Sequence, residues 1–372
     1  MADKLKHRWS IGNNYLAGIT ATDWWNLLRD NKFSVDPAYW HRAAVVSVLS
    51  VFNSVQHWRE ERRWHDVIES TQVTEVPLFI LGHWRSGTTH LHNLIAQDSN
   101  QFAYANTYQV ISPHTFLTTE KFNTRWFAGM VPDKRPMDNM AMGFQTPQED
   151  EFGPALITGM SSYFGMSFPR RMQDYDRYLT FHDVPRVERE EWKAGFLWFL
   201  KKLTLKYKRR LVLKSPPHTA RIRLLLELFP DAKFIHIHRN PYDVYQSFCH
   251  FYDTALWYTY LQRPDLKAIP EQILNRYTEL YDAFFADLSL IPAGHFHEIR
   301  YENLERDPVG QIRDAYTALN ISGFDSCQSQ LEHYVSSLST YKKNKFNNLT
   351  EPVRNRIAKH WQRSFDKWGY EV

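Results

Sequence analysis

The residues with the most distinctive types and spacing lie in the stretch Leu78–Asn93, which reads LFILGHWRSGTTHLHN. Its first four residues are apolar and predict a buried strand of a parallel sheet, which Gly82 ends. Gly82 and Gly87 have the spacing of the loop G-x-x-x-x-G-K-[ST], in which backbone N–H groups and a helix N-terminus hold phosphate oxygens. Thr88 stands where that loop has a lysine, and Arg85 lies inside it. The stretch predicts an anion site, and the alternative interpretation is a ligand-free turn from strand to helix.

Side chains suited to anions also follow three other predicted strands, at residues 210–216, 234–238 and 296–300. Ligands of open parallel sheets bind beyond the carboxyl ends of the strands. The four strands are therefore expected to bring cationic and hydroxyl-bearing residues to one edge of the sheet. These residues are Arg85–Thr89, Lys214, Ser215, Arg239, Asn240, Tyr301 and Glu302.

Two further features add to this edge. Ser247 follows Arg239 by eight residues, so if a helix begins at Pro241 the two side chains can hold one phosphate from two sides. Tyr341–Phe346 reads YKKNKF, and its three lysines are either another cationic element or a solvated loop.

The same edge lacks groups that a nucleotide hydrolase or kinase needs. Those enzymes hold Mg²⁺ with the loop Ser or Thr and a strand-end acid, and they use the loop lysine. Here the lysine is absent, and the strand that would supply the acid ends in His238 and Arg239. We therefore predict a nucleotide anion that is bound without a metal ion and is neutralised by basic side chains.

Three consecutive acids, Glu149–Glu151, lie in the segment 145–157, which reads QTPQEDEFGPALI. With Thr146 as N-cap and Pro147 at the first helical position, Glu149 completes a capping box, which predicts a structural role for it. The other two acids either complement the helix dipole or, together with the first, provide a general base.

Residues up to about 70 have the pattern of helices. Asp36 and Pro37 resemble an N-cap and a first helical residue, and the apolar run that follows gives way to arginine and glutamate at Arg59–Arg63. Such a helix either packs over a core or lies on a membrane surface. We expect a helical N-terminal extension of residues 1–70, which packs on the core or contacts a membrane peripherally, and a domain of residues 71–372.

Helices are expected at residues 187–207, 218–229 and 269–291 and from Pro241 onward, between the short apolar strands. This alternation predicts an α/β fold, with a P-loop-like central parallel sheet flanked by helices and the helical segment added at the N-terminus.

Composition narrows the class of protein. Of the 372 residues, 43% are hydrophobic and 15% are aromatic, which suits a sizeable core and a ring-lined pocket. The net charge of +4 favours an anionic ligand, and we expect no nucleic-acid partner, since such binders carry denser basic patches.

Cysteine usage and the N-terminus bear on location. With only Cys249 and Cys327, no disulfide framework or cysteine zinc site is indicated. The N-terminal sequence MADKLKHRWS lacks the apolar region of a signal peptide, and the apolar run Ala43–Phe52 is too short to span a bilayer. We expect a cytoplasmic protein.

These motifs together resemble the sulfotransferases that use 3′-phosphoadenosine 5′-phosphosulfate (PAPS), and more narrowly a bacterial branch with the GHWRSGTTHLHN loop and a PQEDEF segment. The resemblance covers roughly residues 77–346. It implies that Gly82–Thr89 binds the 5′-phosphosulfate, that Arg239 and Ser247 bind the 3′-phosphate, and that the tyrosine of Tyr301–Leu304 lies near adenine. The YKKNKF loop would close over the 3′-phosphate. The implied cofactor-binding residues are Trp84, Arg85, Ser86, Gly87, Thr88, Thr89, Arg239, Ser247, Tyr301, Lys342 and Lys343.

The resemblance also implies the chemistry, an in-line transfer of a sulfuryl group to an acceptor hydroxyl, with no metal and with 3′,5′-bisphosphoadenosine (PAP) as product. Lys214, in the K-S-P strand end seen in carbohydrate sulfotransferases, is expected to stabilise the transferring group, or else only to position the cofactor. The segment FAYANTYQV has no acid where some relatives carry a catalytic glutamate. The base is therefore expected among Glu149, Glu151 and His218.

The acceptor is expected to be a small hydroxyl compound. The aromatic content favours an apolar alcohol such as a sterol or lipid, and a carbohydrate or tyrosine acceptor remains the alternative. Two other classes stay open, a nucleotide-dependent kinase of the same loop family and a binding module that has lost its base.

Overall fold

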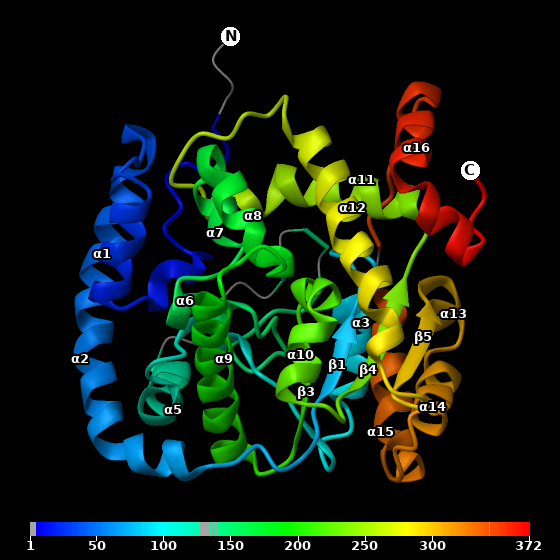
Figure 1. Cartoon of the computed structure of the whole chain (residues 1–372), viewed down its shortest axis with the longest axis horizontal. Coiled ribbons are helices and arrows are strands. Elements are labelled where there is room, and N and C mark those ends of the chain that lie inside the picture. Colours follow the sequence, from blue (N-terminus) through cyan, green and yellow to red (C-terminus); the bar gives the residue numbers. More distant parts are fainter. Residues whose placement is uncertain (1–4, 127–133, 136, 139, 342) are drawn as a thin grey trace. The chain divides into compact units, whose positions relative to one another are not determined.

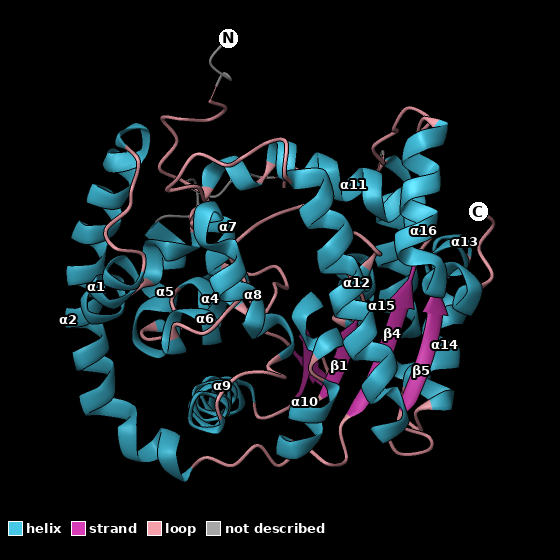
Figure 2. Cartoon of the chain, turned by 45° about the horizontal axis from the view of Figure 1, so that its top comes forward, coloured by secondary structure: helices cyan, strands magenta, loops and turns pink. Residues whose placement is uncertain are grey.

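The centre of the structure, a computed structural model, is a five-stranded parallel sheet in the order β2-β3-β1-β4-β5. The structure describes residues 5–126, 134–135, 137–138, 140–341 and 343–372. The strands are β1 (Leu78–Leu81), β2 (Phe102–Ala103), β3 (Arg210–Lys214), β4 (Lys233–His238) and β5 (Phe296–Arg300), shown in magenta in Figure 2. The predicted α/β fold with a central parallel sheet is therefore confirmed, and β2 is an addition to the four predicted strands.

The chain divides into two compact units. The first, here called the sheet unit, comprises Thr74–Tyr104, Arg209–His250 and Lys267–Val372. The second, the helical unit, comprises Met1–Val73, Ala105–Lys208 and Phe251–Leu266. Residues 1–70 thus form part of a larger helical unit with later segments of the chain, and their separation as an extension stays a prediction.

Helices cover both faces of the sheet in the sheet unit (Figure 1). One face carries a core of aliphatic side chains from the strands and from α3, α14 and α15, in which Ile80, Leu91 and Ile312 are fully buried. The other face packs against α10, α12 and a 3₁₀ turn at Pro216–Ala220. The helices of this unit are α3 (Thr88–Ile95), α10 (Ile222–Leu228), α11 (Pro241–Thr254, which continues into the helical unit), α12 (Ile269–Asp287), α13 (Tyr301–Arg306), α14 (Pro308–Ala318), α15 (Phe324–Ser337) and α16 (Glu351–Trp368).

In the described part of the helical unit, regular structure is helical. Its helices are α1 (Ala21–Asp30), α2 (Trp40–Ser70), α4 (Thr107–Ile111), α5 (Phe116–Trp126), α6 (Phe152–Thr158), α7 (Phe164–Ser167), α8 (Met172–Thr180) and α9 (Arg186–Tyr207). Asp36 is the N-cap residue and Pro37 the first helical residue of a 3₁₀ turn at Pro37–Tyr39 that leads into α2, as predicted. The Asp36 side chain makes no capping bond and pairs with Arg170 at 2.8 Å. Among the residues that the structure describes, no helix has both the length and the apolarity needed to cross a membrane.

The helix expected over residues 145–157 begins only at Phe152, so the predicted capping box of Thr146 and Glu149 is wrong. The chain around Pro147 is extended, since Gln148 donates its N–H to the Ala105 carbonyl at 3.0 Å and Thr146 accepts from Thr107 at 3.1 Å. Backbone partners far away in the sequence thus replace the first helical turn. The capping box lies instead at Asn106 and Gln109, at the start of α4.

Two smaller differences affect the predicted site. The helix expected from His218 is a 3₁₀ turn at Pro216–Ala220 followed by α10, and His218 lies in the turn. Tyr301, expected in a turn after β5, is the first residue of α13.

Candidate active site

The loop after β1 is held in a conformation that two glycines permit. Gly82 has φ +146° and Gly87 has φ +105°, values that side chains disfavour. A Cβ on Gly82 would lie 2.5 Å from the Ile237 carbonyl oxygen, and one on Gly87 would lie 2.3 Å from the Tyr301 ring. Arg85 between them also has a positive φ of +72°. The loop therefore packs directly on β4 and α13, and its conformation is costly for Arg85.

Hydrogen bonds within and beside the loop fix its shape. The Gly82 N–H donates to Thr219 Oγ1 at 2.7 Å, and the buried Ser86 hydroxyl donates to the His83 carbonyl at 2.8 Å. The His83 ring lies 2.7 Å from the Trp84 carbonyl through Nδ1, so Nδ1 carries the proton. Burial lowers the pKa of His83 to about 3, and this imidazole is neutral at physiological pH.

The loop leads into the N-terminus of α3, where Gly87 is the N-cap and Thr88 the first helical residue. The first N–H groups of a helix have no partner within it, and they carry the positive end of its dipole. Trp84 is buried and stacks on Phe248 of α11, with 5.8 Å between ring centroids. The predicted strand–loop–helix anion site therefore has the expected local structure.

Two predicted cations of the sheet unit lie at this loop. Arg85 Nε donates to Ser247 Oγ of α11 at 3.0 Å. Lys214, buried at the end of β3, directs its Nζ at Thr89 Oγ1 at 3.5 Å. The structure thus brings residues of the loop after β1, of β3 and of α11 to the start of α3. Ser247, expected to act beside Arg239, contacts Arg85.

A second cationic group surrounds Tyr301. The Arg239 guanidinium lies 4.5 Å from the Tyr301 ring centroid, and the Lys343 ammonium lies 5.9 Å from it. Arg239 also pairs with Asp243 at 3.2 Å, and Lys343 pairs with Glu305. Burial raises the pKa of Tyr301 to about 12, so the phenol is neutral. Lys342, the other predicted lysine, lies outside the described residues.

The Nε atom of Arg239 is buried and has no hydrogen-bond partner among the residues that the structure describes. A buried donor of this kind normally has a partner, and a phosphate oxygen is the acceptor that a guanidinium fits best. The side chain therefore suits a bound anion.

Glu302, another residue expected at this edge, has a structural role. Its carboxylate accepts from the Asn240 N–H at 3.1 Å and from the Tyr370 hydroxyl at 2.9 Å. These bonds fix the turn between β4 and α11.

The predicted base candidates divide between the two units. His218 is buried in the sheet unit, edge-on to Phe79 with 5.4 Å between ring centroids. Glu149 and Glu151 belong to the helical unit. Glu149 accepts from the Tyr163 hydroxyl at 2.5 Å, and the buried Glu151 accepts from Ser161 at 2.6 Å. Their catalytic roles stay predictions.

Two residues that hold the loop backbone were not predicted from the sequence. Thr219 accepts from Gly82, and the buried Tyr281 hydroxyl accepts from the His83 N–H at 3.4 Å. Neither residue belongs to a recognisable motif. Only Thr219 could have been suspected from the sequence, because it lies just after the K-S-P strand end.

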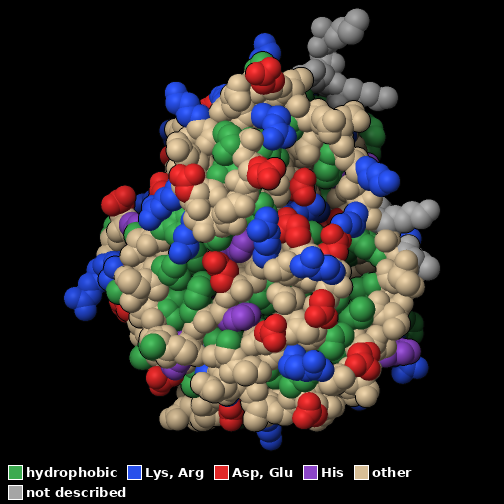
Figure 3. Space-filling view, turned by 90° about the vertical axis from the view of Figure 1, so that its right-hand side faces the viewer, with side chains coloured by type: hydrophobic (Ala, Val, Ile, Leu, Met, Phe, Trp, Pro, Cys, Tyr) green, Lys and Arg blue, Asp and Glu red, His purple; other side chains and the backbone are tan. Residues whose placement is uncertain are grey.

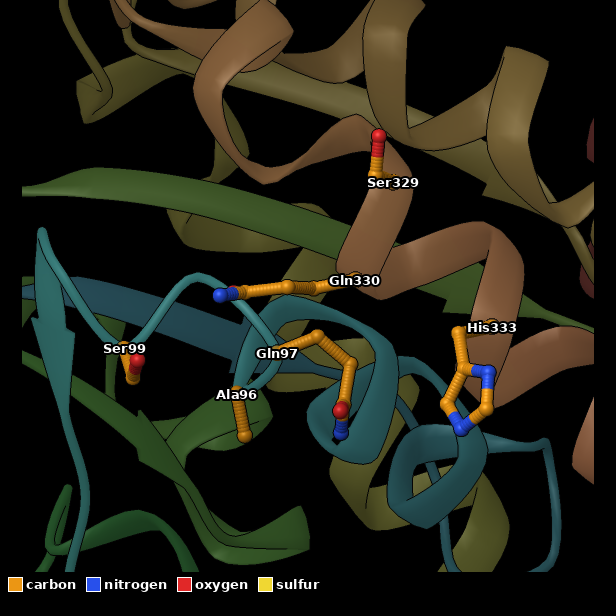
Figure 4. Close-up of a pocket in the computed structure, with 6 residues that line it drawn as sticks. All are labelled: Ala96, Gln97, Ser99, Ser329, Gln330 and His333. Carbon is orange, nitrogen blue, oxygen red and sulfur yellow. The ribbon is translucent and has the colours of Figure 1, made fainter.

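Two other surface features lie apart from these residues. A depression of about 460 Å³ lies at the C-terminal end of α3 (Figure 4). Residues of α15 and of the chain after α3 line it, and none of them is a predicted site residue: Ala96, Gln97, Ser99, Ser329, Gln330 and His333. On the face drawn in Figure 3, Lys and Arg side chains are interspersed with Asp and Glu. Among the described residues, no group of three or more His, Cys, Asp or Glu side chains is arranged to hold a metal ion.

Comparison with known proteins identifies the family. The sequence model of the sulfotransferase family matches residues 77–326. The chain is 34% identical over 358 residues to omega-hydroxy-beta-dihydromenaquinone-9 sulfotransferase Stf3 of Mycobacterium bovis. The aligned region covers 95% of this chain and 90% of that protein. The same values hold for Stf3 of Mycobacterium tuberculosis.

Two crystal structures have the same fold. Sulfotransferase STF9 from Mycobacterium avium superposes with a TM-score of 0.68 at 18% identity, over 95% of this chain and 98% of that one. Sulfotransferase STF1 from Mycobacterium tuberculosis H37Rv gives 0.63 at 15% identity, over 91% and 92%. The chain therefore belongs to the sulfotransferase family and is a sulfotransferase.

Proposed function

We propose that this sulfotransferase moves the sulfuryl group of PAPS to the hydroxyl of a small apolar alcohol. The observation that supports this proposal most is the joining of Arg85, Lys214 and Ser247 around the start of α3. Arg85 contacts Ser247 of α11, and Lys214 of β3 contacts Thr89 of α3. Polar groups from separate parts of the chain thus lie beside a helix start whose N–H groups can hold an anion.

The donor would be held by residues of the sheet unit. The N–H groups at the start of α3 and the Arg85 guanidinium suit the phosphosulfate end. The half-buried Arg239, whose Nε atom is buried, suits the 3′-phosphate. The Tyr301 ring, already in contact with Arg239, offers a flat surface for adenine. When bound, PAPS supplies an activated sulfuryl group with PAP as the leaving group.

Lys214 would act on the charge that develops during transfer. Its ammonium is buried at the end of β3 and directed at Thr89, where water screens it little. A fixed positive charge in such a place stabilises a developing anion without reorganisation. Replacement by alanine is expected to lower kcat about 10²–10³-fold. The matched control is Lys359→Ala, which removes an exposed lysine of α16.

A base must also remove the acceptor proton. We propose Glu149, Glu151 or His218 for this role. Glu151 and His218 are buried, and the Glu149 and Glu151 carboxylates accept hydrogen bonds. These contacts would keep the three side chains in fixed orientations.

The acceptor class follows from the relative and from composition. Stf3, by its name, acts on an omega-hydroxylated dihydromenaquinone, which is a lipid carrying a hydroxyl group. The aromatic content of 15% suits contact with a similarly apolar molecule. We propose a lipid or sterol-like alcohol, with a carbohydrate or tyrosine hydroxyl as the alternative.

The test is a transfer assay with sulfur-labelled PAPS and four acceptors: a polyprenyl alcohol, a sterol, an oligosaccharide and a tyrosine peptide. The proposal predicts label on the apolar alcohols, undiminished by EDTA. Label on the oligosaccharide or peptide alone would overturn the acceptor class. Phosphate transfer from ATP that requires Mg²⁺, without sulfuryl transfer, would overturn the proposed donor.

A further inference from the structure

Helix α2 of the helical unit buries more polar than apolar side chains. Of its five buried residues, Arg42, Ser50 and Glu60 are polar or charged. Helices on a protein surface normally bury their apolar face. The side chains that α2 leaves exposed therefore require a separate explanation.

Polar contacts hold α2 in the helical unit. Arg42 donates from Nη1 to the carbonyls of Trp257 and Tyr260, at 2.8 and 2.9 Å. Glu60 pairs with Lys202 of α9 at 2.6 Å, and both side chains are buried. On the same side of α2, the side chains of Ser47, Asn53 and Ser54 form hydrogen bonds with residues that precede the helix. These contacts fix the rotation of the helix about its axis.

The fixed rotation leaves an apolar stripe exposed. At about 100° per residue, its members fall within roughly one third of the helix circumference, and they span about 27 Å. They are between 46% and 72% exposed: Trp40, Val48, Val51, Phe52, Val55 and Trp58. Figures 1 and 2 show α2 with α1 along one of its sides. The stripe, called here the outer stripe, has an aromatic residue at each end.

Positive charge follows the outer stripe directly. Arg59 and Arg62 continue the same side of α2, and Arg63 lies at its margin. These three arginines form no ion pair with any residue that the structure describes, although Arg62 lies 4.9 Å from the Trp58 ring centroid.

The acids near these arginines have other partners, with one exception. Glu61 contacts His65 at 2.5 Å, and Glu69 pairs with Lys201 at 3.2 Å. Asp66 alone remains on the exposed side, beyond the arginines. The end of the outer stripe therefore carries an excess of positive charge.

We propose that α2 docks on an anionic phospholipid surface through the outer stripe and these three arginines. The outer stripe has a tryptophan at each end and arginines after it. Tryptophan and arginine side chains are typical of the headgroup region of a bilayer. The valines and Phe52 enter the acyl boundary, and the guanidinium groups bind lipid phosphates. The inference rests on α2 alone and holds for any acceptor.

Flotation of the full chain with vesicles tests this docking. Wild type is expected to bind vesicles of phosphatidylcholine with phosphatidylglycerol more tightly than phosphatidylcholine alone. The triple variant Val48→Ser, Val51→Ser, Val55→Ser should bind about fiftyfold more weakly, if each valine is roughly half buried in lipid. Its Tm should not fall, because these side chains contact solvent.

Two variants separate the contributions. Replacing Arg59, Arg62 and Arg63 by glutamine should weaken binding to the anionic vesicles about fivefold per arginine and leave binding to neutral vesicles unchanged. Val187→Ser is the matched control, because Val187 is 77% exposed on α9 of the same unit, and it should bind as wild type does.

Three results would overturn the proposal. The first is that wild type binds neither kind of vesicle, and the second is that the triple valine variant binds as well as wild type. The third is that wild type binds no vesicles but dimerises in ultracentrifugation, and that the triple variant does not dimerise. The last result would assign the outer stripe to a second copy of the chain. Sulfuryl transfer is not measured, so failure here leaves the proposed reaction untouched.

Discussion

Gly87→Ala tests whether the loop between β1 and α3 depends on its close contact with α13. The added Cβ would lie 2.3 Å from the Tyr301 ring, and the residue would keep a φ of +105°. The matched control is Gly294→Ala in the same unit, where φ is +81° and no atom lies within 4 Å of the added Cβ.

The two variants share the backbone penalty of alanine at positive φ, about 1 kcal/mol. Only Gly87→Ala adds the overpacking against Tyr301, about 1–3 kcal/mol. For a unit of about 180 residues, each kcal/mol lowers Tm by about 2–4 °C. Gly87→Ala should therefore lower Tm by a further few degrees beyond the control.

Calorimetric titration with PAP provides the functional measurement. Displacement of Tyr301 disturbs its contact with Arg239, so Gly87→Ala should weaken PAP binding while Gly294→Ala leaves it unchanged. In the double variant with Tyr301→Ala, the alanine at 87 should destabilise less than it does alone. Equal losses of Tm and unchanged PAP affinity in both glycine variants would show that neither the stability of the protein nor PAP binding depends on the close contact between Gly87 and Tyr301.

Three further predictions concern single side chains. Arg239→Ala should weaken PAP binding about 10–100-fold at unchanged Tm, measured by calorimetry, and unchanged affinity would remove this residue from the 3′-phosphate site. A general base contributes about 10²–10⁴-fold in rate, so either Glu149→Gln or Glu151→Gln should lower kcat by that factor. If both variants have the kcat of wild type, His218 is the remaining candidate for the base. Burial alone would raise the pKa of Glu298, but its bond to His236 and the nearby histidines lower it from 4.5 to about 2. The stabilisation from Glu298 is therefore complete above pH 4.5 and is lost as the pH falls toward 2, and Glu298→Gln should show a smaller fall of Tm over that range.

The sheet was predictable because its strands are short apolar runs that end in glycine or in charged residues. Leu78–Leu81 and Phe296–Arg300 have the predicted bounds. β2 is only two residues long, Phe102 and Ala103, and it forms because β3 offers its edge. A local pattern carries no signal for a strand that depends on its neighbour.

The error at residues 145–157 has a similar cause. Thr146, Pro147 and Glu149 have the types and spacing of a helix start, but the backbone of Ala105 and Thr107 provides competing partners. The composition of the units from separated segments also depends on such contacts, and a sequence without an alignment does not reveal them.

The sequence predicted the local structure of the loop after β1 better than it predicted the partners of each side chain. Gly82, Gly87 and Lys214 have the predicted places, because glycine spacing and strand ends are local features. The bond from Arg85 to Ser247 joins residues 162 positions apart and was not predicted. The helix after Pro37 was expected either to pack over a core or to lie on a membrane surface, because an amphipathic pattern does not say which side of a helix faces inward.

Sulfuryl transfer from PAPS without a metal ion is the reaction that we propose for the residues around the start of α3, among them Arg85, Lys214 and Ser247. The most direct measurement follows label from sulfur-labelled PAPS onto a polyprenyl alcohol, with EDTA present, for wild type and for Lys214→Ala and Lys359→Ala. We expect transfer by wild type and by Lys359→Ala, and transfer about 10²–10³-fold slower by Lys214→Ala. Equal transfer by all three proteins, or transfer that stops when EDTA is added, would contradict the proposed reaction.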